Sequence, residues 1–188
     1  MADFTVHTPE SAPEATRPLF ERSKSEFGML PNLHAVMGES PELLDAYQTL
    51  WGLMQKTSFS PLEQQVVMQT ANVENECHYC VPAHGTMVLG MTDEATARAL
   101  AHGEPLGDAK LEALRAFTLD VLRTKGRPSK DATEAFFAAG YGTKQALEVV
   151  VGLATKVLSN YTNALAGTPL DAPFVPAVGK LGLEPQPA

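Results

Sequence analysis

The sequence feature that most constrains the fold is a repeated helix start signal, a serine followed directly by a proline. Ser40-Pro41 and Ser60-Pro61 each join a residue that caps helix N-termini to a proline suited to the first turn. The proline's missing N–H would have no partner there in any case. Glu63, three residues after Ser60, completes a capping box. Both sites therefore predict the start of a long helix.

Helical periodicity continues along most of the chain, and no stretch keeps the alternation of a strand. We expect further helices to begin near Glu14, Asn32, Thr92, Asp108, Ser129 and Thr143. The last of them should be capped by Thr143 and run to about Ala166. Its buried side should consist of Leu147, Val150, Val151, Ala154, Val157, Leu158 and Tyr161. The sequence therefore predicts an all-α fold, a helical bundle.

The length and the distribution of prolines predict how the chain is organised. A chain of 188 residues can form one domain that buries about 70% of its unfolded surface, and no internal repeat divides it. We expect a single domain over residues 1–188, with an N-terminal arm (1–13), a helical core (14–166) and a C-terminal tail (167–188). Both terminal segments are rich in proline and lack a clear period. The tail is a candidate for packing on a partner subunit.

Charge restricts the expected partners. The net charge of −8 and the pI of about 5.1 argue against the broad basic face that nucleic-acid binding requires. The first ten residues lack a basic region followed by an apolar core, and no apolar run is long enough to cross a bilayer. We expect a cytoplasmic protein without nucleic-acid or membrane partners. In that compartment a pair of nearby cysteines is more often catalytic or metal-binding than a permanent disulfide.

The chemistry-bearing residues gather between positions 77 and 84. If this segment is helical, Cys77, Cys80 and His84 are spaced i, i+3, i+7 and share one face. Two cysteines this close can cycle between dithiol and disulfide. Pro82 places Cys80 in a first helical turn, where unpaired N–H groups and the helix dipole lower a thiol pKa. We therefore expect Cys80 to be the attacking thiol and Cys77 its resolving partner. His84 should accept a proton from Cys80 or stabilise its anion.

Other interpretations of these residues remain open. A CxxC motif is often half of a zinc site, but a structural zinc ion needs four ligands and the chain has no further cysteine. An open zinc site formed by Cys77, Cys80 and His84 stays as an alternative, although we expect no metal or other cofactor. Gln65 lies on the buried stripe of the preceding helix, as a satisfied core amide or as part of the site. We expect His78 to be solvated.

These motifs resemble a known family. Residues 62–67 (LEQQVV), the Cys77-His78-Tyr79-Cys80 motif and then His84 resemble the alkyl hydroperoxidase D and carboxymuconolactone decarboxylase family. Residues 28–33 and 158–163 are similar to the subgroup often labelled peroxidase-related. The resemblance implies an all-helical fold, trimers or hexamers, and thiol peroxidase chemistry. A hydroperoxide would be the substrate, and a dithiol protein the reductant.

The resemblance also implies roles for individual residues. Cys80 would attack the peroxide oxygen and become a sulfenic acid, and Cys77 would close the disulfide. His84 matches the histidine of the family's proton relay. Gln65 stands where peroxidase members carry a glutamate, and it cannot accept a proton as a carboxylate does. The predicted catalytic set is thus Cys80, Cys77, His84 and Gln65. A carboxymuconolactone decarboxylase-like enzyme without redox chemistry and a redox-sensing oligomer without turnover are the alternatives.

Overall fold

The computed structural model describes residues 4–184, and these form ten α-helices, two short 3-10 helices and no strand. The helices are α1 (Arg17–Phe27), α2 (Asn32–Met37), α3 (Pro41–Met54), α4 (Pro61–Glu74), α5 (Cys80–Val88), α6 (Glu94–His102), α7 (Ala109–Arg123), α8 (Lys130–Ala138), α9 (Thr143–Ala166) and α10 (Val175–Leu181), with 3-10 helices η1 (Glu14–Thr16) and η2 (Ala172–Phe174). The prediction of an all-α fold is confirmed.

The start signals act as predicted. The Ser60 hydroxyl accepts the Glu63 N–H, and the Glu63 carboxylate accepts the Ser60 N–H at 2.8 Å, so the capping box of α4 is complete. Ser40 likewise caps α3. The expected cap of α9 is wrong by one residue. Thr143 is the first helical residue, and the capping position belongs to Gly142, whose N–H donates to the side chain of Gln145.

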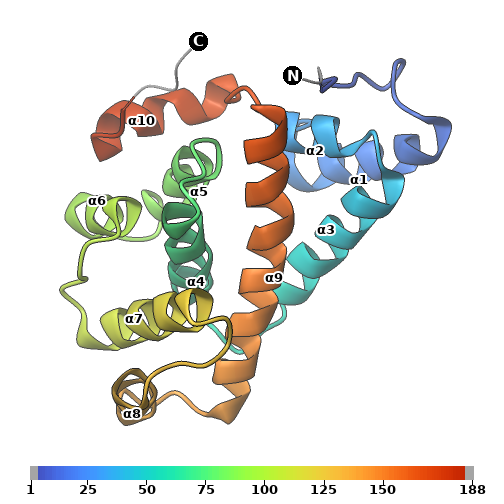
Figure 1. The fold of residues 1–188 in the computed structure, drawn as a ribbon. Helices are drawn as coiled ribbons and strands as arrows, with labels where there is room; N and C mark the ends of the chain where they lie inside the picture. Colours follow the sequence, from blue (N-terminus) through green and yellow to red (C-terminus); the bar gives the residue numbers. More distant parts are fainter. Residues whose placement is uncertain (1–3, 185–188) are drawn as a thin grey trace.

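The long helix α9 is central to the arrangement (Figure 1). It runs between a group formed by α1, α2 and α3 and a second group that contains α4, α5, α6 and α7, and it packs directly on α2, α3 and α4. Gly152 permits the contact with α4, because a Cβ atom there would lie 2.6 Å from a methyl of Val67. Short α10 crosses α5 and α6.

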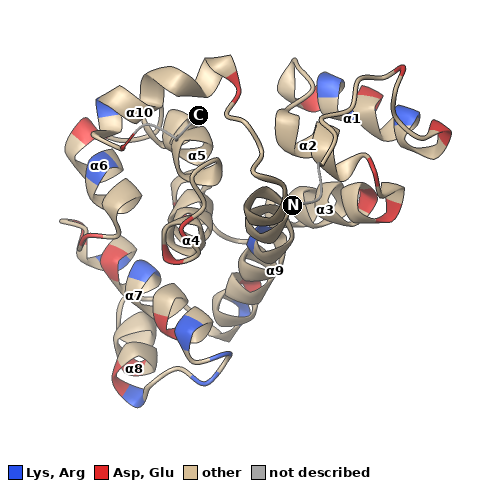
Figure 2. Cartoon of the chain, turned by 45° about the horizontal axis from the view of Figure 1, so that its top comes forward, with Lys and Arg blue, Asp and Glu red and all other residues tan. Residues whose placement is uncertain are grey.

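Charged side chains lie mainly on the peripheral helices (Figure 2). Helix α5 contains no Lys, Arg, Asp or Glu, and most of its residues are buried. Helix α4 is buried from Glu63 to Asn72, beyond the single stripe that its pattern suggests. Within residues 4–184, no helix combines the length and the apolar character needed to span a membrane.

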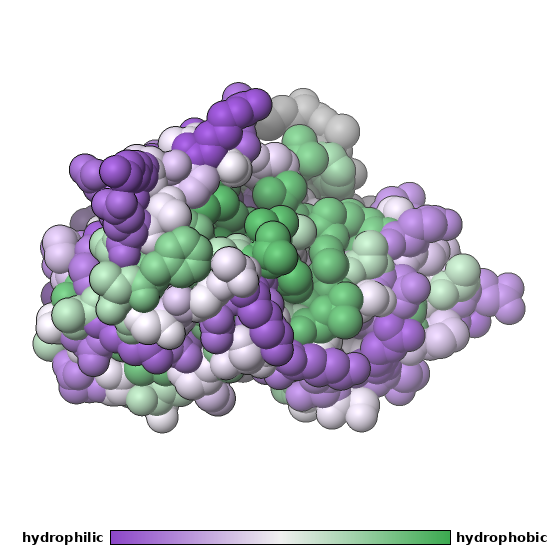
Figure 3. Space-filling model, turned by 90° about the horizontal axis from the view of Figure 1, so that it is seen from below, coloured by the Kyte–Doolittle hydropathy of each residue, from purple (hydrophilic) through white to green (hydrophobic). Residues whose placement is uncertain are grey.

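The orientation of α9 differs from the prediction. Its buried residues are mostly small or polar, namely Val149, Gly152, Thr155, Lys156, Ser159, Asn160 and Asn163. Leu147, Val150 and Tyr161 were expected to be buried, yet they are 72%, 53% and 55% exposed. The prediction failed because the inward polar groups find partners in the interior, which removes most of the penalty for burying them. Figure 3 views the end where α9 begins and shows apolar surface inside a polar rim.

Both terminal segments contact the rest of the chain. Within the described part of the arm, His7 bonds to Glu39 at 2.6 Å and lies beside α2. The tail contains α10, which its pattern did not predict. Leu181 of this helix is fully buried and packs where Gly85 of α5 has no side chain. This tertiary contact supplies the burial that orders a segment without clear periodicity. Residues 1–3 and 185–188 of the expected arm and tail lie outside the described residues.

Candidate active site

A tight turn at the end of α4 positions the first cysteine. The Cys77 N–H donates to the Asn72 carbonyl at 2.9 Å, and the Glu76 N–H donates to the Val73 carbonyl at 3.0 Å. This is a Schellman motif, which requires a left-handed residue at the position of Glu76. Glu76 has φ of 50°, although a side chain in that conformation costs about 1 kcal/mol. The local backbone thus accepts strain to turn the chain toward the CxxC motif.

The two cysteines occupy different local environments. Cys80 is the first residue of α5, as predicted, whereas Cys77 precedes the helix. The predicted continuous helical face over positions 77, 80 and 84 is therefore only partly formed. The Cys80 N–H donates to Cys77 Sγ at 3.2 Å. Both residues are buried and present as free thiols.

Helix α9 contributes an amide that contacts both sulfur atoms. Asn163 Nδ2 donates to Cys80 Sγ at 3.2 Å and lies 3.7 Å from Cys77 Sγ. One turn earlier, Asn160 donates to Asn72 Oδ1 at 2.9 Å and accepts from Asn75 Nδ2 at 2.9 Å. This network ties α9 to the end of α4 directly beneath the CxxC turn.

A second buried network joins α4, α5 and α9. Lys156 Nζ contacts His84 Nε2 at 2.9 Å, and His84 Nδ1 contacts Gln65 Oε1 at 2.8 Å. An ammonium group only donates, so His84 Nε2 accepts and its Nδ1 carries the proton donated to Gln65. Gln65 also contacts the sulfur of Met87 at 3.7 Å. Gln65 therefore lies in this buried network and accepts the Nδ1 proton of His84.

The surroundings shift the pKa values of the two thiols in opposite directions. Burial by itself would raise the pKa of Cys80, but the hydrogen bond from Cys77, the charge of Lys156 and the Asn163 amide lower this pKa to about 6. The same hydrogen bond, in which the Cys77 thiol is the donor, raises the pKa of Cys77, and burial adds to this effect. The site therefore favours a Cys80 thiolate beside a Cys77 thiol.

His84 does not occupy the place that the sequence predicts. Among residues 4–184 neither of its ring nitrogens bonds to a cysteine, because Gln65 and Lys156 occupy them. Burial, followed by the charge of Lys156, holds the pKa of His84 well below its ordinary value. The expected direct transfer of a proton from Cys80 to His84 is not formed in this structure.

Sequence reasoning gave no role in the site to Lys156, Asn160 or Asn163, although the last two lie within residues 158–163. They follow one another at i, i+4 and i+7, so they form a polar stripe along α9. This stripe was a usable signal. The prediction gave more weight to the apolar stripe on the opposite side of the helix.

Three further side chains near the CxxC motif lie outside these networks. His78 is exposed, as predicted. Tyr79 is buried and donates its hydroxyl to Asp171. Glu74 forms a two-pronged ion pair with Arg123 at 2.8 Å and does not reach the cysteines. Within residues 4–184 no group of three or more His, Cys, Asp or Glu side chains is arranged to hold a metal ion.

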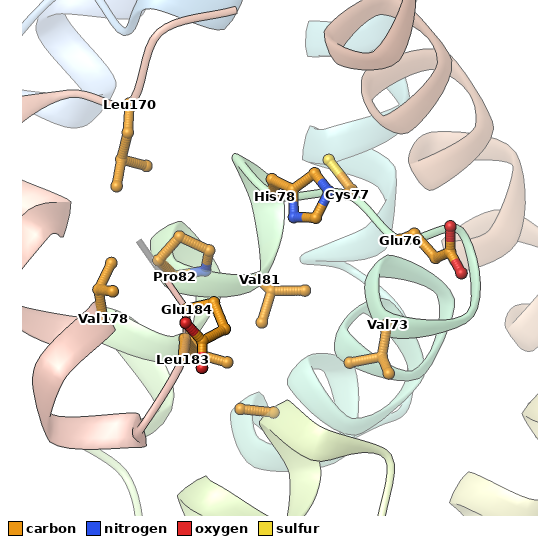
Figure 4. A pocket seen from close by; sticks show the side chains of 11 residues that line it. Val73, Glu76, Cys77, His78, Val81, Pro82, Leu170, Val178, Leu183 and Glu184 are labelled. Atoms are coloured by element: carbon orange, nitrogen blue, oxygen red, sulfur yellow. The ribbon is translucent and has the colours of Figure 1, made fainter. Parts of the chain in front are cut away.

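Three cavities adjoin the cysteines. The Cys80 cavity measures about 40 Å³ and is bordered by Cys80, His84, Lys156 and a wall of rings that includes Phe27, His34, Tyr47, Trp51, Tyr79 and Phe174. The Cys77 cavity, of about 340 Å³, lies between residues 75–79 and 163–168. The α10 cavity, of about 440 Å³, has Cys77 and His78 at one end and Val178 and Leu183 at the other (Figure 4).

Comparison with known proteins defines the fold class. No protein-family model and no curated protein sequence matches the chain. Solved structures do match. One is an uncharacterized peroxidase-related protein from Ralstonia eutropha JMP134, described as an alkylhydroperoxidase AhpD core. It is 19% identical over 91% of this chain and 93% of that chain, with a TM-score of 0.79. The chain thus has the alkylhydroperoxidase D-like fold that its motifs resemble.

Two further neighbours share this fold. A peroxidase-related protein from Silicibacter sp. TM1040 is 20% identical over 92% of each chain, with a TM-score of 0.76. The debrominase Bmp8 is 17% identical over 95% of this chain and 97% of its own, with a TM-score of 0.78. A cysteine-to-alanine variant of Bmp8 in complex with 2,3,4-tribromopyrrole matches with a TM-score of 0.79.

Proposed function

We propose that the protein is a thiol oxidoreductase that reduces hydroperoxides through Cys80 and Cys77. The observation that carries the proposal is the difference in pKa between the two buried thiols. Cys80 at the start of α5 has a lowered pKa, and Cys77 donates a hydrogen bond to it. A thiolate is the nucleophile of peroxide reduction, and a neighbouring thiol can resolve the oxidised sulfur. The fold shared with peroxidase-related proteins supports the same reaction class.

In the first step the Cys80 thiolate attacks one peroxide oxygen. The S–O bond forms, the O–O bond breaks, and the departing hydroxide or alkoxide takes a proton. Lys156, which borders the Cys80 cavity, is the proposed donor of that proton. His84 and Gln65 are positioning residues, because the Gln65–His84–Lys156 chain of hydrogen bonds holds the ammonium group in place.

In the second step the Cys77 thiol attacks the Cys80 sulfenic acid. The disulfide forms and water leaves, so the protein has given two electrons to the peroxide. A dithiol protein then reduces the disulfide and becomes oxidised itself, and its two protons restore the Cys77 thiol and the Lys156 ammonium group. Such a cycle suits a reducing compartment, and we propose a cytoplasmic location.

The test measures peroxide consumption with dithiothreitol as the electron donor. Wild-type protein should consume peroxide continuously, and Cys80→Ser should not consume it. Without added dithiothreitol, reduced Cys77→Ser protein should consume about one peroxide per chain and form a stable sulfenic acid, because no thiol is present to resolve it. Alkylation of Cys80 should rise with pH to a plateau, with a midpoint at about 6. A midpoint near the free-thiol value of about 8.5 would contradict an activated nucleophile.

Reductive dehalogenation is a second candidate that uses the same electrons. The fold shared with Bmp8 and the rings around Cys80 support it. Two thiols would replace an aryl C–Br bond by C–H, releasing bromide and a proton and leaving a disulfide. The small volume of the Cys80 cavity, about 40 Å³, weighs against dehalogenation. A brominated ring could enter this cavity only by displacing the aromatic side chains that line it. Bromide release from 2,3,4-tribromopyrrole, without peroxide consumption, would favour this candidate over the first.

We also propose that the chain forms a homo-oligomer through the outward face of α9. Leu147, Val150, Tyr161 and Leu165 are each more than half exposed and recur at helical spacing. A row of exposed apolar side chains of this length is typical of an interface. The resemblance of the sequence to a family of trimers and hexamers supports a second copy as the occupant.

A further inference from the structure

The two cysteines border cavities of very different size. Cys80 meets the Cys80 cavity of about 40 Å³. One water needs about 10–15 Å³ of such space, so the cavity holds a few water-sized atoms and fits hydrogen peroxide. Its wall includes Tyr47 and Trp51, which are buried side chains that cannot move aside freely. A reactant with many heavy atoms therefore cannot readily reach Cys80 through this cavity.

The Cys77 cavity has room for a larger reactant, and one residue that borders it has a buried acceptor without a partner. At about 340 Å³ it is bordered by Cys77, Asn163 and Ala164. Asn163 is 5% exposed, and its Nδ2 is directed at the two sulfur atoms. Its Oδ1 has no hydrogen-bond partner among residues 4–184. A buried acceptor without a partner costs free energy that a ligand's O–H or N–H donor can recover.

We propose that the two half-reactions use two different cavities beside the cysteine pair. An oxidant as small as hydrogen peroxide reaches Cys80 through the Cys80 cavity, and a dithiol reductant reaches Cys77 through the Cys77 cavity, where it donates a hydrogen bond to Asn163 Oδ1. This inference rests on the proposed function and adds to it the size class of the oxidant and the binding site of the reductant.

The chemistry of the reduction agrees with attack at Cys77. A donor thiolate forms a bond to Cys77 Sγ, the Cys77–Cys80 bond breaks, and Cys80 leaves as the thiolate. Thiols of lower pKa leave faster, and Cys80 has the lowered pKa of the pair. The second donor thiol then attacks the mixed disulfide and loses its proton. Cys77 leaves and takes up this proton, and the donor becomes a disulfide.

Two single-cysteine variants test the access to each sulfur. Cys77→Ser retains Cys80, and Cys80→Ser retains Cys77. With hydrogen peroxide, Cys80 should react about tenfold faster than Cys77, because it is the more ionised thiol beside the small cavity. With dipyridyl disulfide, a bulky reagent, the order should reverse. If the same cysteine reacts faster with both reagents, the division of access is wrong.

Two cavity-filling variants test the binding site of the reductant. Ala164→Phe, at an exposed position on α9, should fill the Cys77 cavity and slow reduction of the disulfide by dithiothreitol about tenfold. Val178→Phe places the same ring in the neighbouring α10 cavity and should change this rate less than about twofold. The ring of Trp51, the single tryptophan, has its centroid 5.9 Å from that of His84. Its fluorescence offers a signal for the reduction rates of both variants.

The outcomes separate this inference from the proposed function. If wild-type protein does not consume hydrogen peroxide with dithiothreitol, the proposed function fails. If it does, but cumene hydroperoxide is reduced as fast as hydrogen peroxide, the inferred size limit is overturned while the function stands. If Val178→Phe slows reduction and Ala164→Phe does not, the inferred binding site is overturned.

Discussion

The two faces of α9 reverse the usual arrangement of an amphipathic helix. The inward face carries Lys156, Asn160 and Asn163, whereas the outward face carries Leu147 and Leu165, which are 72% and 73% exposed. The inward polar groups are stabilised by specific partners, namely His84, Asn72 and the two sulfur atoms. The comparison teaches that the availability of buried hydrogen-bond partners decides which side of this helix faces inward. The apolar side is left for a proposed second copy of the chain.

Replacing the inward lysine should have the largest effect. We expect Lys156→Met to reduce peroxide turnover about 100-fold or more, because it removes both a proton donor and a positive charge that favours the Cys80 thiolate. The midpoint of the alkylation profile should move upward in pH, since the cation lowers the pKa. Lys144→Met, at an exposed position of the same helix, is the matched control. An unchanged profile in Lys156→Met would remove Lys156 from the site.

Charging the outward face should change assembly without changing the chemistry. We expect Leu147→Glu combined with Leu165→Glu to lower the mass measured by light scattering toward that of one 20.1 kDa chain. Alkylation of Cys80 should keep its rate. Met91→Glu, at an exposed apolar position away from α9, should leave the mass unaltered. A wild-type protein that is already monomeric at micromolar concentration would contradict the proposed interface.

Removing the amide that touches both sulfurs should have an intermediate effect. Asn163→Ala deletes the hydrogen bond to Cys80, and we expect alkylation at pH 6 to slow about fivefold, equivalent to about 1 kcal/mol. Because this bond stabilises the charged form, its loss should raise the pKa of Cys80. Thr162→Ala, one position earlier on the helix, serves as control. Equal rates in both variants would show that the amide does not act on the thiolate.

The smallest effect should concern packing. Gly152→Ala places a methyl 2.6 Å from Val67, and overpacking of this kind costs about 1–3 kcal/mol, partly offset by about 1 kcal/mol of helix propensity. We expect a net loss of about 1 kcal/mol in unfolding free energy and a fall of about 2–4 °C in Tm. On the outward face, Val150→Ala should change the free energy of unfolding by less than about 0.5 kcal/mol, measured under conditions where the chain is monomeric. A stabilised Gly152→Ala variant would mean that α4 and α9 approach less closely than described.

The sequence alone determined most of the helices, α10 excepted, and the position of Cys80 at a helix start. Helix starts are local, because a capping side chain and a first-turn proline act within three residues, as at Ser60 and Glu63. The same kind of signal placed Cys80 at the start of α5. Only the tertiary structure decided that Lys156 meets His84 across 72 positions and that Asn163 meets Cys80 across 83. No local period encodes such contacts, because the choice of buried face depends on partners that folding brings together from distant segments.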